Sequence, residues 1–442
     1  MTNISHPPSP RGGGWFPSTT PSHDTARRAI THAHALGVSL SMSLAIRLAT
    51  VYGTMFLFTG VYLPFFPVWL KSKGLDAGEI SLVVALSLFL RIVVSPFFAS
   101  VADRLGDRRR VALWLAWASL GSAALFLFVE GFGPILLVAL VLNAVFPSIS
   151  PLVETIAMRA RIEEGMNYGR VRLWGSITFI AASAGAGWLL EWNAPSIVVL
   201  CIVAALVSNV AGVSLLPRVP APVRKPARHG EKRFAAILEI GRHPVFVLFV
   251  LSASLTQATH AVYYAFGSLA WQRQGYSDTV IGLLWAAGVV AEIVLFYISG
   301  PLMARFGAVR LVMLAAAAAV LRWTVTALNP PVALLFLMQL LHGFTFGAAH
   351  LGAVQFVAQA APPRLAATAQ SLYAAMASGV IMGLVTIGIG PIYEALGPQA
   401  YFVMAGAGVV ALLGAFMVGR RWHGEVLAPE EEGLERQEEH GN

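Results

Sequence analysis

The sequence predicts an all-α integral membrane protein, with twelve transmembrane helices arranged in two pseudo-symmetric six-helix bundles. Three observations predict this fold class: an apolar composition, apolar runs long enough to cross a membrane, and basic residues concentrated in alternate loops. Hydrophobic residues make up 57% of the 442 positions, and charged residues make up only 12%. A soluble protein of this length needs far more charge to cover its surface.

Apolar runs bounded by charged residues, glycine or proline mark the expected helices. Each run is long enough for a membrane crossing, which takes about 20 mostly apolar residues. In chain order the expected spans cover residues 46–70, 78–101, 111–130, 134–158, 171–190, 195–216, 244–271, 279–302, 308–328, 331–357, 366–391 and 399–419.

The longest interruption between spans is rich in proline and in basic residues, and it divides the chain into two halves of six spans. The polar N-terminal stretch lacks the compact apolar core of a signal peptide. A translation start at Met42 is a hypothesis that an N-terminal mass measurement would test. The expected domains are a disordered cytoplasmic tail (1–43), an N-terminal bundle (44–216), a cytoplasmic linker (217–243), a C-terminal bundle (244–421) and an acidic cytoplasmic tail (422–442).

Basic residues indicate the orientation, because Lys and Arg concentrate in the cytoplasmic loops of membrane proteins. One set of alternate loops holds only Lys71, Lys73 and Arg273. Both termini are therefore expected on the cytoplasmic side of a multi-pass protein in the cytoplasmic (inner) membrane. The net charge of +8 then indicates topology, whereas nucleic-acid binding would need basic residues clustered on a soluble element. The basic loops contain Arg104, Arg108, Arg109, Arg110, Arg159, Arg161, Arg170, Arg218, Arg224, Lys225, Arg228, Lys232, Arg233, Arg242, Arg305, Arg310 and Arg364.

Two loops repeat a short pattern at equivalent places in the two halves. The chain has DRLG at 103–106, after the second span, and ARFG at 304–307, after the eighth. Weak symmetry between six-span halves is typical of duplicated transporters. The same offset places Arg91, in span two, onto Glu292, in span eight, so the halves present opposite charges at equivalent positions.

The first of these loops, ADRLGDRRR, resembles the loop signature of the major facilitator superfamily. In that family the loop is a conformational latch, and the resemblance implies that Asp103, Arg104 and Gly106 belong to it. The alternative is a solvated cluster of charges at a helix end. Ala304 replaces the acidic residue of the signature in the second copy.

Two longer segments carry a closer resemblance. Residues 151–176 resemble the lactose permease-like proton symporters, and residues 259–296 resemble the phenylpropionate permease family. Together with LLHGF at 341–345, the resemblance extends over 46–420. It implies two six-helix bundles around a central cavity, in a protein that acts as a monomer.

Ionisable residues inside a membrane are costly and mark functional sites when they face a water-filled cavity. Glu292 lies in the middle of span eight, where snorkelling cannot bring its short side chain to water. Arg322 lies deep in span nine and needs a carboxylate partner or an anionic substrate, with Glu292 as a candidate partner. His342, in span ten, can titrate near physiological pH. The resemblance to lactose permease implies that these residues join substrate binding to coupling; a structural Glu–Arg pair is the alternative.

Further candidates lie on the other spans. Glu154 and Asn143 are expected on one face of span four. The resemblance implies that Glu154 and Arg172 contribute to substrate binding, with snorkelling at the interface as the alternative. Arg91 is expected either to line the cavity and attract an anion or to pair locally.

Aromatic residues beside a polar stripe suit a solute that contains a ring, although helix packing also explains them. His260 and Tyr264 lie on such a stripe in span seven. A weaker stripe in span one consists of Tyr52, Phe56 and Thr59.

The sequence departs from the lactose permease pattern at two positions. Thr345 stands where that pattern has a carboxylate one turn after the histidine, and Gln339 stands where it has a lysine. Proton coupling, if it occurs, must therefore use Glu292 or Glu154.

Together these observations predict a permease: a secondary active transporter that moves a small organic solute by alternating access. A proton-coupled symporter of an aromatic carboxylate of the phenylpropionate type is favoured. A sugar or nucleoside proton symporter and an exporter of the same fold are the alternatives. The expected partners are the solute, protons and membrane lipid, without nucleic acid.

An enzyme is not expected, because the sequence contains one cysteine and no His-x-x-x-His pair. We therefore predict no catalytic residue, metal or cofactor. The sequence also lacks the phosphate-binding Gly-x-x-x-x-Gly-Lys-Ser/Thr motif, so ATP is not expected to drive transport directly.

Overall fold

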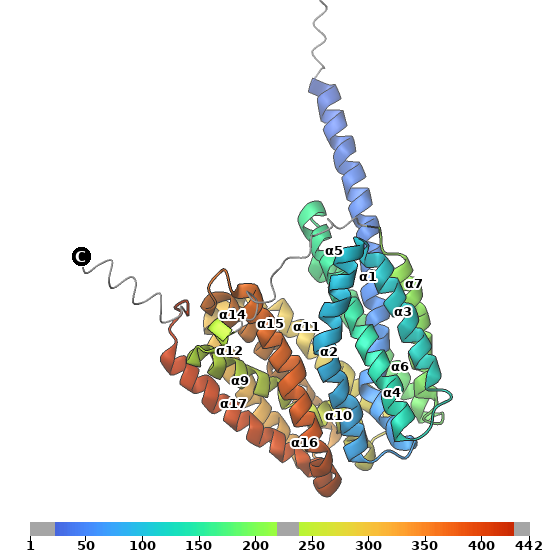
Figure 1. Cartoon of the computed structure of the whole chain (residues 1–442), viewed down its shortest axis with the longest axis vertical. Coiled ribbons are helices and arrows are strands. Elements are labelled where there is room, and N and C mark those ends of the chain that lie inside the picture. The colour runs from blue at the N-terminus through green and yellow to red at the C-terminus, as the bar shows by residue number, and fades with distance from the viewer. Residues whose placement is uncertain (1–22, 219–237, 428–442) are drawn as a thin grey trace, which may run out of the picture.

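The computed structural model describes residues 23–218 and 238–427, and these ranges are almost entirely helical, with no strand in either (Figure 1). The helices form two bundles that lie close together at one end, the lower end in Figure 1, and diverge toward the other. The predicted fold class, an all-α membrane protein of two helix bundles, is confirmed.

The N-terminal bundle follows the expected spans closely. It consists of α1 (His23–Ser72), α2 (Ala77–Leu105), α3 (Arg108–Leu125), α4 (Phe132–Val145), the 3₁₀ turn η1 (Phe146–Ser148), α5 (Ile149–Glu164), α6 (Tyr168–Glu191) and α7 (Ile197–Ser214).

Several helices of the C-terminal bundle are interrupted. The bundle consists of α9 (Pro244–Ala258), α10 (Ala261–Arg273), α11 (Asp278–Tyr297), α12 (Ser299–Ala327), α13 (Val332–Leu340), the π segment η2 (Gly343–Ala348), α14 (Ala349–Ala360), α15 (Ala366–Ala375), the π segment η3 (Met376–Val380), α16 (Ile381–Leu396), the 3₁₀ turn η4 (Gly397–Ala400) and α17 (Tyr401–Arg421).

Ten stretches of the described residues are long and apolar enough to cross a membrane. One of them, Ala366–Arg421, reverses at Gly397, so that α16 and α17 run in opposite directions (Figure 1). The helix α3 is not among the ten, because three arginines, Arg108 to Arg110, open its eighteen residues. It nevertheless packs against α7 within the bundle. The number of twelve crossings stays a prediction.

The structure differs from the expected tails. A disordered stretch is predicted through residue 43, whereas α1 already begins at His23. Residues 23–36 are rich in alanine and lack glycine and proline, a composition that favours helix. After α17, the backbone N–H of Leu427 donates to the carbonyl of Ala360 (2.8 Å). The remainder of the predicted linker and of the acidic tail, residues 219–237 and 428–442, lies outside the described residues.

The two loops of the sequence repeat each end in a glycine with a positive φ, although the ψ angles differ, 10° at Gly106 and 174° at Gly307. Gly106 caps α2 with a φ of 67°, and Gly307 breaks α12 with a φ of 70°. A positive φ of this kind is costly for a residue with a Cβ atom. The glycine of the repeated pattern therefore allows a positive φ in both halves.

At the end where the bundles meet, each bundle caps a helix of the other. A Glu394 carboxylate oxygen accepts the backbone N–H of Ala77 at the start of α2 (3.1 Å). A Glu191 carboxylate oxygen accepts the N–H of Thr279 at the start of α11 (3.3 Å). A carboxylate at a helix N-terminus satisfies an unpaired donor and complements the helix dipole. We call Glu191 and Glu394 the crossed caps, because each acts on the opposite bundle.

The backbones also approach closely at this end. A Cβ atom added to Gly282, in α11, would lie 2.2 Å from the carbonyl oxygen of Ser183, in α6. One added to Gly390, in α16, would lie 2.2 Å from the hydroxyl oxygen of Ser81, in α2. Small residues allow such contact between membrane helices. The junction therefore includes two closely packed pairs of helices, α6 with α11 and α2 with α16.

Candidate functional site

A cavity of about 550 Å³ lies between the two bundles, within the range of small-molecule sites. Its wall contains four residues that the sequence predicts for the site, Glu292, His342, Arg172 and Tyr264. The other residues that line it are Phe56, Thr59, Leu63, Tyr168, Ser176, Phe179, Tyr263, Trp285, Val289, Ile293, Phe296, Phe346 and His350. We call this space the central cavity.

One wall of the central cavity carries a chain of hydrogen bonds. The Nε2 atom of His342 lies 2.8 Å from a carboxylate oxygen of Glu292. Its Nδ1 atom lies 2.9 Å from a guanidinium nitrogen of Arg322. An arginine can only donate, so Nδ1 accepts and Nε2–H donates to Glu292. His342 is thereby neutral, and it connects a cation to an anion through its ring.

The sequence suggests a direct pair between Glu292 and Arg322, and the structure corrects this by placing His342 between them. Arg322 is fully buried and does not line the central cavity. Its side chain donates to Gln339 (2.7 Å) and Thr345 (2.9 Å), besides His342. These neutral acceptors bond the two terminal nitrogens of a guanidinium that would otherwise be costly to bury, whereas its Nε atom has no hydrogen-bond partner among the described residues.

Thr345 extends this network to span seven. The carbonyl of Gln257 accepts from Nδ1–H of His260 (2.9 Å), so the Nε2 atom of His260 accepts from the hydroxyl of Thr345 (3.0 Å). His260 is fully buried and does not reach the central cavity. Of the predicted stripe in span seven, therefore, Tyr264 faces the cavity and His260 faces the network behind it.

On the opposite wall of the central cavity, Arg172 belongs to a second charged pair, whose acid, Glu154, does not itself line the cavity. Arg172 Nε lies 3.8 Å from a carboxylate oxygen of Glu154, and the hydroxyl of Tyr168 donates to the other oxygen (2.9 Å). The guanidinium of Arg172 also lies over the rings of Phe56 (4.2 Å) and Tyr52 (5.3 Å). Such stacking on aromatic faces is favourable for arginine.

Aromatic rings form much of the surface between the two charged walls. Tyr263 stacks on Trp285, with ring centroids 4.1 Å apart, and Phe346 stacks on the ring of His342 (5.5 Å). The sequence predictions do not include Tyr168 or Trp285. Tyr168 follows a loop that marks only a helix start, and Trp285 lies in an apolar run without a polar neighbour, so neither position carried a signal.

Besides Arg322, His260 and Glu154, two further predicted residues, Arg91 and Asn143, do not line the central cavity. Both line a smaller cavity of about 140 Å³, which shares Leu63 and Tyr264 with the central one. The sequence places Asn143 and Glu154 on one face of a single helix. In the structure the 3₁₀ turn η1, which contains Pro147, lies between them, and their partners differ: Asn143 donates to Tyr62, whereas Glu154 contacts Tyr168 and Arg172.

The predicted latch contains a local ion pair. A carboxylate oxygen of Asp103 accepts from a guanidinium nitrogen of Arg108 (2.6 Å), and the left-handed Gly106 lies between them. The pair joins the end of α2 to the start of α3 within one bundle. The role of this loop as a conformational latch stays a prediction, and so does the part of Arg104 in it.

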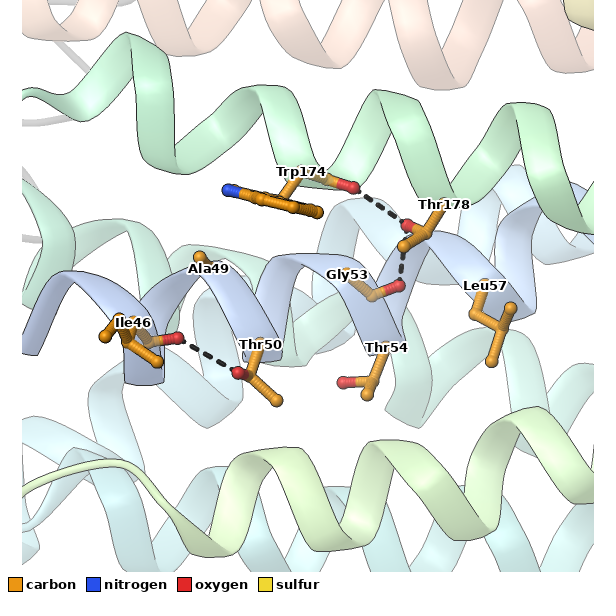
Figure 2. A pocket seen from close by; sticks show the side chains of 8 residues that line it. All are labelled: Ile46, Ala49, Thr50, Gly53, Thr54, Leu57, Trp174 and Thr178. Carbon is orange, nitrogen blue, oxygen red and sulfur yellow. Dashed lines mark hydrogen bonds between the residues drawn. The ribbon is translucent and has the colours of Figure 1, made fainter. Parts of the chain in front are cut away.

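A third cavity, of about 400 Å³, lies between the middle of α1 and the first half of α6 (Figure 2). Its lining is mostly apolar and contains none of the predicted site residues. Figure 2 shows the hydroxyl of Thr178 beside the carbonyls of Trp174 and Gly53, and that of Thr50 beside the carbonyl of Ile46. These polar groups are satisfied by the backbone, so this cavity offers little to a polar solute.

Comparison with known proteins gives consistent results. The family that matches, over residues 45–404, is described as the MFS_1-like family. A probable 3-phenylpropionic acid transporter of Escherichia coli (strain K12) is 31% identical over 380 residues, which cover 84% of this chain and 96% of that protein. The maltose permease of Geobacillus stearothermophilus is 28% identical over 332 residues, or 74% of this chain and 82% of that protein.

Solved structures agree on the fold. A point mutant of the nucleoside transporter NupG superposes with a TM-score of 0.76 at 17% identity, covering 85% of this chain and 99% of that one. A bacterial homologue of the lysosomal transporter Spinster, in an inward-facing and unoccupied conformation, gives a TM-score of 0.69 at 14% identity, covering 86% and 97%.

Proposed function

Because the chain belongs to the MFS_1-like family of major facilitator transporters, we propose that it is a proton-coupled permease for an aromatic carboxylate. The proposal includes transport by alternating access between the two bundles, across the cytoplasmic membrane, with both termini in the cytoplasm. The basic loops described above support that orientation. A relative named as a probable 3-phenylpropionic acid transporter supports the substrate class.

The observation that carries this proposal is the make-up of the central cavity. Its aromatic surface, with Tyr263, Tyr264 and Trp285, suits a planar ring. Its cationic side chain, Arg172, and its acid, Glu292, lie in the walls on either side of that surface. The aromatic rings can hold the ring of the solute and Glu292 can take a proton, while Arg172 makes the same space more positive, with its guanidinium facing Glu154.

Glu292 is the group that we propose to carry the proton. It lies in the cavity wall, it accepts a hydrogen bond from His342, and no arginine or lysine pairs with it directly among the described residues. Thr345 cannot take this role, because its hydroxyl does not titrate in the physiological range. Glu154, which faces Arg172, is the second candidate.

The test is uptake by purified protein in liposomes, with 3-phenylpropionate, maltose and uridine as alternative solutes. We expect accumulation of the acid when the outside is acidified, and collapse of accumulation when a protonophore is added. Saturable uptake of maltose or uridine without uptake of the acid would overturn the substrate class. Accumulation that is insensitive to the protonophore would overturn proton coupling. In a separate experiment with cells that express the protein, export of the solute from the cytoplasm would favour an exporter.

A sugar or nucleoside is the second candidate, favoured by the environment of Glu154. This carboxylate accepts from the hydroxyl of Tyr168, and carboxylates also bind the hydroxyls of sugars well. A maltose permease is among the relatives, and NupG is among the structures with the same fold. In that case Glu154→Gln should abolish binding of the neutral solute.

A further inference from the structure

The described spans hold three arginines near the two cavities, and two of them already have partners. Arg322 donates to Gln339, His342 and Thr345. Arg172 faces the carboxylate of Glu154. Neither guanidinium is therefore free to neutralise the charge of an incoming anion without giving up a bond that it already makes.

Arg91 is different. It lies at the midpoint of α2, which spans Ala77–Leu105, and no described residue forms a hydrogen bond or an ion pair with it. An arginine at such a depth needs an anion or water to compensate its charge, because the surrounding hydrocarbon cannot. A guanidinium has five donors arranged in a fork that matches a carboxylate.

The surroundings of Arg91 supply further polar groups but no acid. The smaller cavity that it lines also contains Tyr62, Ser87 and Asn143. Asn143 donates to the Tyr62 oxygen (2.7 Å) and to the carbonyl of Ala139 (2.9 Å). The hydroxyl of Tyr62 therefore accepts from Asn143, and its own proton is left to donate to a ligand.

The smaller cavity also adjoins the central one. The two share Leu63, from α1, and Tyr264, from α10, so the space around Arg91 lies between the bundles and next to the aromatic surface. An elongated solute could place a ring in the larger space and a charged end in the smaller one, which at about 140 Å³ suits a carboxylate.

We propose that Arg91 is the residue that anchors the carboxylate of the transported aromatic acid, assisted by the hydroxyl of Tyr62. This inference rests on the proposed function and extends it, because it assigns the anion to α2 and leaves Glu292, at the equivalent position of α11, for the proton. The anion and the proton are then held by opposite bundles. Specificity for an acid over its neutral amide follows from Arg91.

The test compares equilibrium binding of 3-phenylpropionate and of the neutral 3-phenylpropionamide to purified protein. Wild type, Arg91→Gln, Arg91→Lys and the control Arg420→Gln, at the exposed end of α17, are measured side by side. In Arg91→Gln we expect the acid to bind about 10- to 100-fold more weakly, the value for loss of a charged hydrogen-bonding partner. The affinity for the amide should stay within about threefold.

Arg91→Lys keeps the positive charge and should retain part of the affinity for the acid. This variant keeps the proposal testable even if Arg91→Gln does not fold. Equal weakening of acid and amide in both variants would overturn the anchor, since it would indicate a packing role. Unchanged affinity for the acid in Arg91→Gln would also overturn it, with the proposed function intact. Wild-type protein that binds maltose or uridine but not the acid would overturn the proposed function and the anchor together.

Discussion

His342 donates its Nε2–H to a carboxylate oxygen of Glu292 at 2.8 Å, because Arg322 donates to the Nδ1 atom of the same ring. The guanidinium thus fixes both the tautomer and the direction of the bond at the edge of the central cavity. The Nε2–H of His342 therefore already points to the carboxylate that we propose to carry the proton.

Glu292→Gln should separate solute binding from proton coupling. The amide oxygen of Gln can still accept from His342, so the local geometry persists, but the side chain cannot take up a proton. Counterflow exchange of 3-phenylpropionate should continue in liposomes, whereas accumulation driven by a pH gradient should fall to the level of empty liposomes. Glu164→Gln, at the exposed end of α5, is the control. Accumulation equal to wild type would exclude Glu292 as the proton carrier.

Thr345→Val should destabilise the C-terminal bundle. The substitution removes an acceptor from Arg322 and the donor to His260, and leaves both groups buried without that partner. The expected loss is about 1–3 kcal/mol, which thermal unfolding of the detergent-solubilised protein would detect as a lower melting temperature. Thr155→Val, an exposed threonine that bonds only to its own helix, should leave it unchanged. Equal melting temperatures for both variants would contradict the network.

Removing the crossed caps should loosen the junction between the bundles. Each carboxylate accepts a backbone N–H at a helix N-terminus of the other bundle, where negative charge is favourable. The reporter is Ile80→Cys in a Cys201→Ser background, since Ile80 is buried at this junction. Maleimide should label it about tenfold faster in Glu191→Ala/Glu394→Ala than in the parent, and less so in either single variant. Identical labelling in all four proteins would show that the caps do not hold this end closed.

Gly282→Ala should act on the same junction through contact of the backbones. The added methyl group would lie 2.2 Å from the carbonyl of Ser183, so α6 and α11 would have to separate. Gly185→Ala is a matched control, because its methyl group would meet no atom within 4 Å. Alanine also gains about 1 kcal/mol over glycine in a helix, which the control measures by itself. We expect faster labelling of Ile80→Cys in Gly282→Ala alone; the same rate in both variants would contradict the close approach.

The fold could be predicted from the sequence to a large extent, because a membrane imposes one strong rule on composition and length. The apolar runs located most of the helices, and the loop repeat located two equivalent glycines that both have a positive φ. The interruptions of spans seven, ten and eleven were not predicted. In spans seven and ten the interruptions lie where side chains of different helices meet, as Thr345 meets His260, and a single apolar run does not show such a contact.

The site was predicted in part, for a related reason. A charge within an apolar run is visible in the sequence, and Glu292, Arg172 and His342 do line the central cavity. Which charged residues form pairs depends on how the helices pack against one another. His342 between Glu292 and Arg322, and the aromatic residue Trp285 in the cavity wall, became evident only with the helices packed.

The breaks in spans seven and ten are joined by hydrogen bonds. Where α9 ends, the backbone carbonyl of Gln257 accepts from His260, and the side-chain amide of Gln257 donates to the carbonyl of Phe346 within η2 (3.3 Å). Thr345, in the same segment, bonds to His260. A substitution at any one of these positions would therefore leave a buried hydrogen-bonding group without its partner unless another position changed with it. In an alignment of relatives, Gln257, His260 and Thr345 should covary.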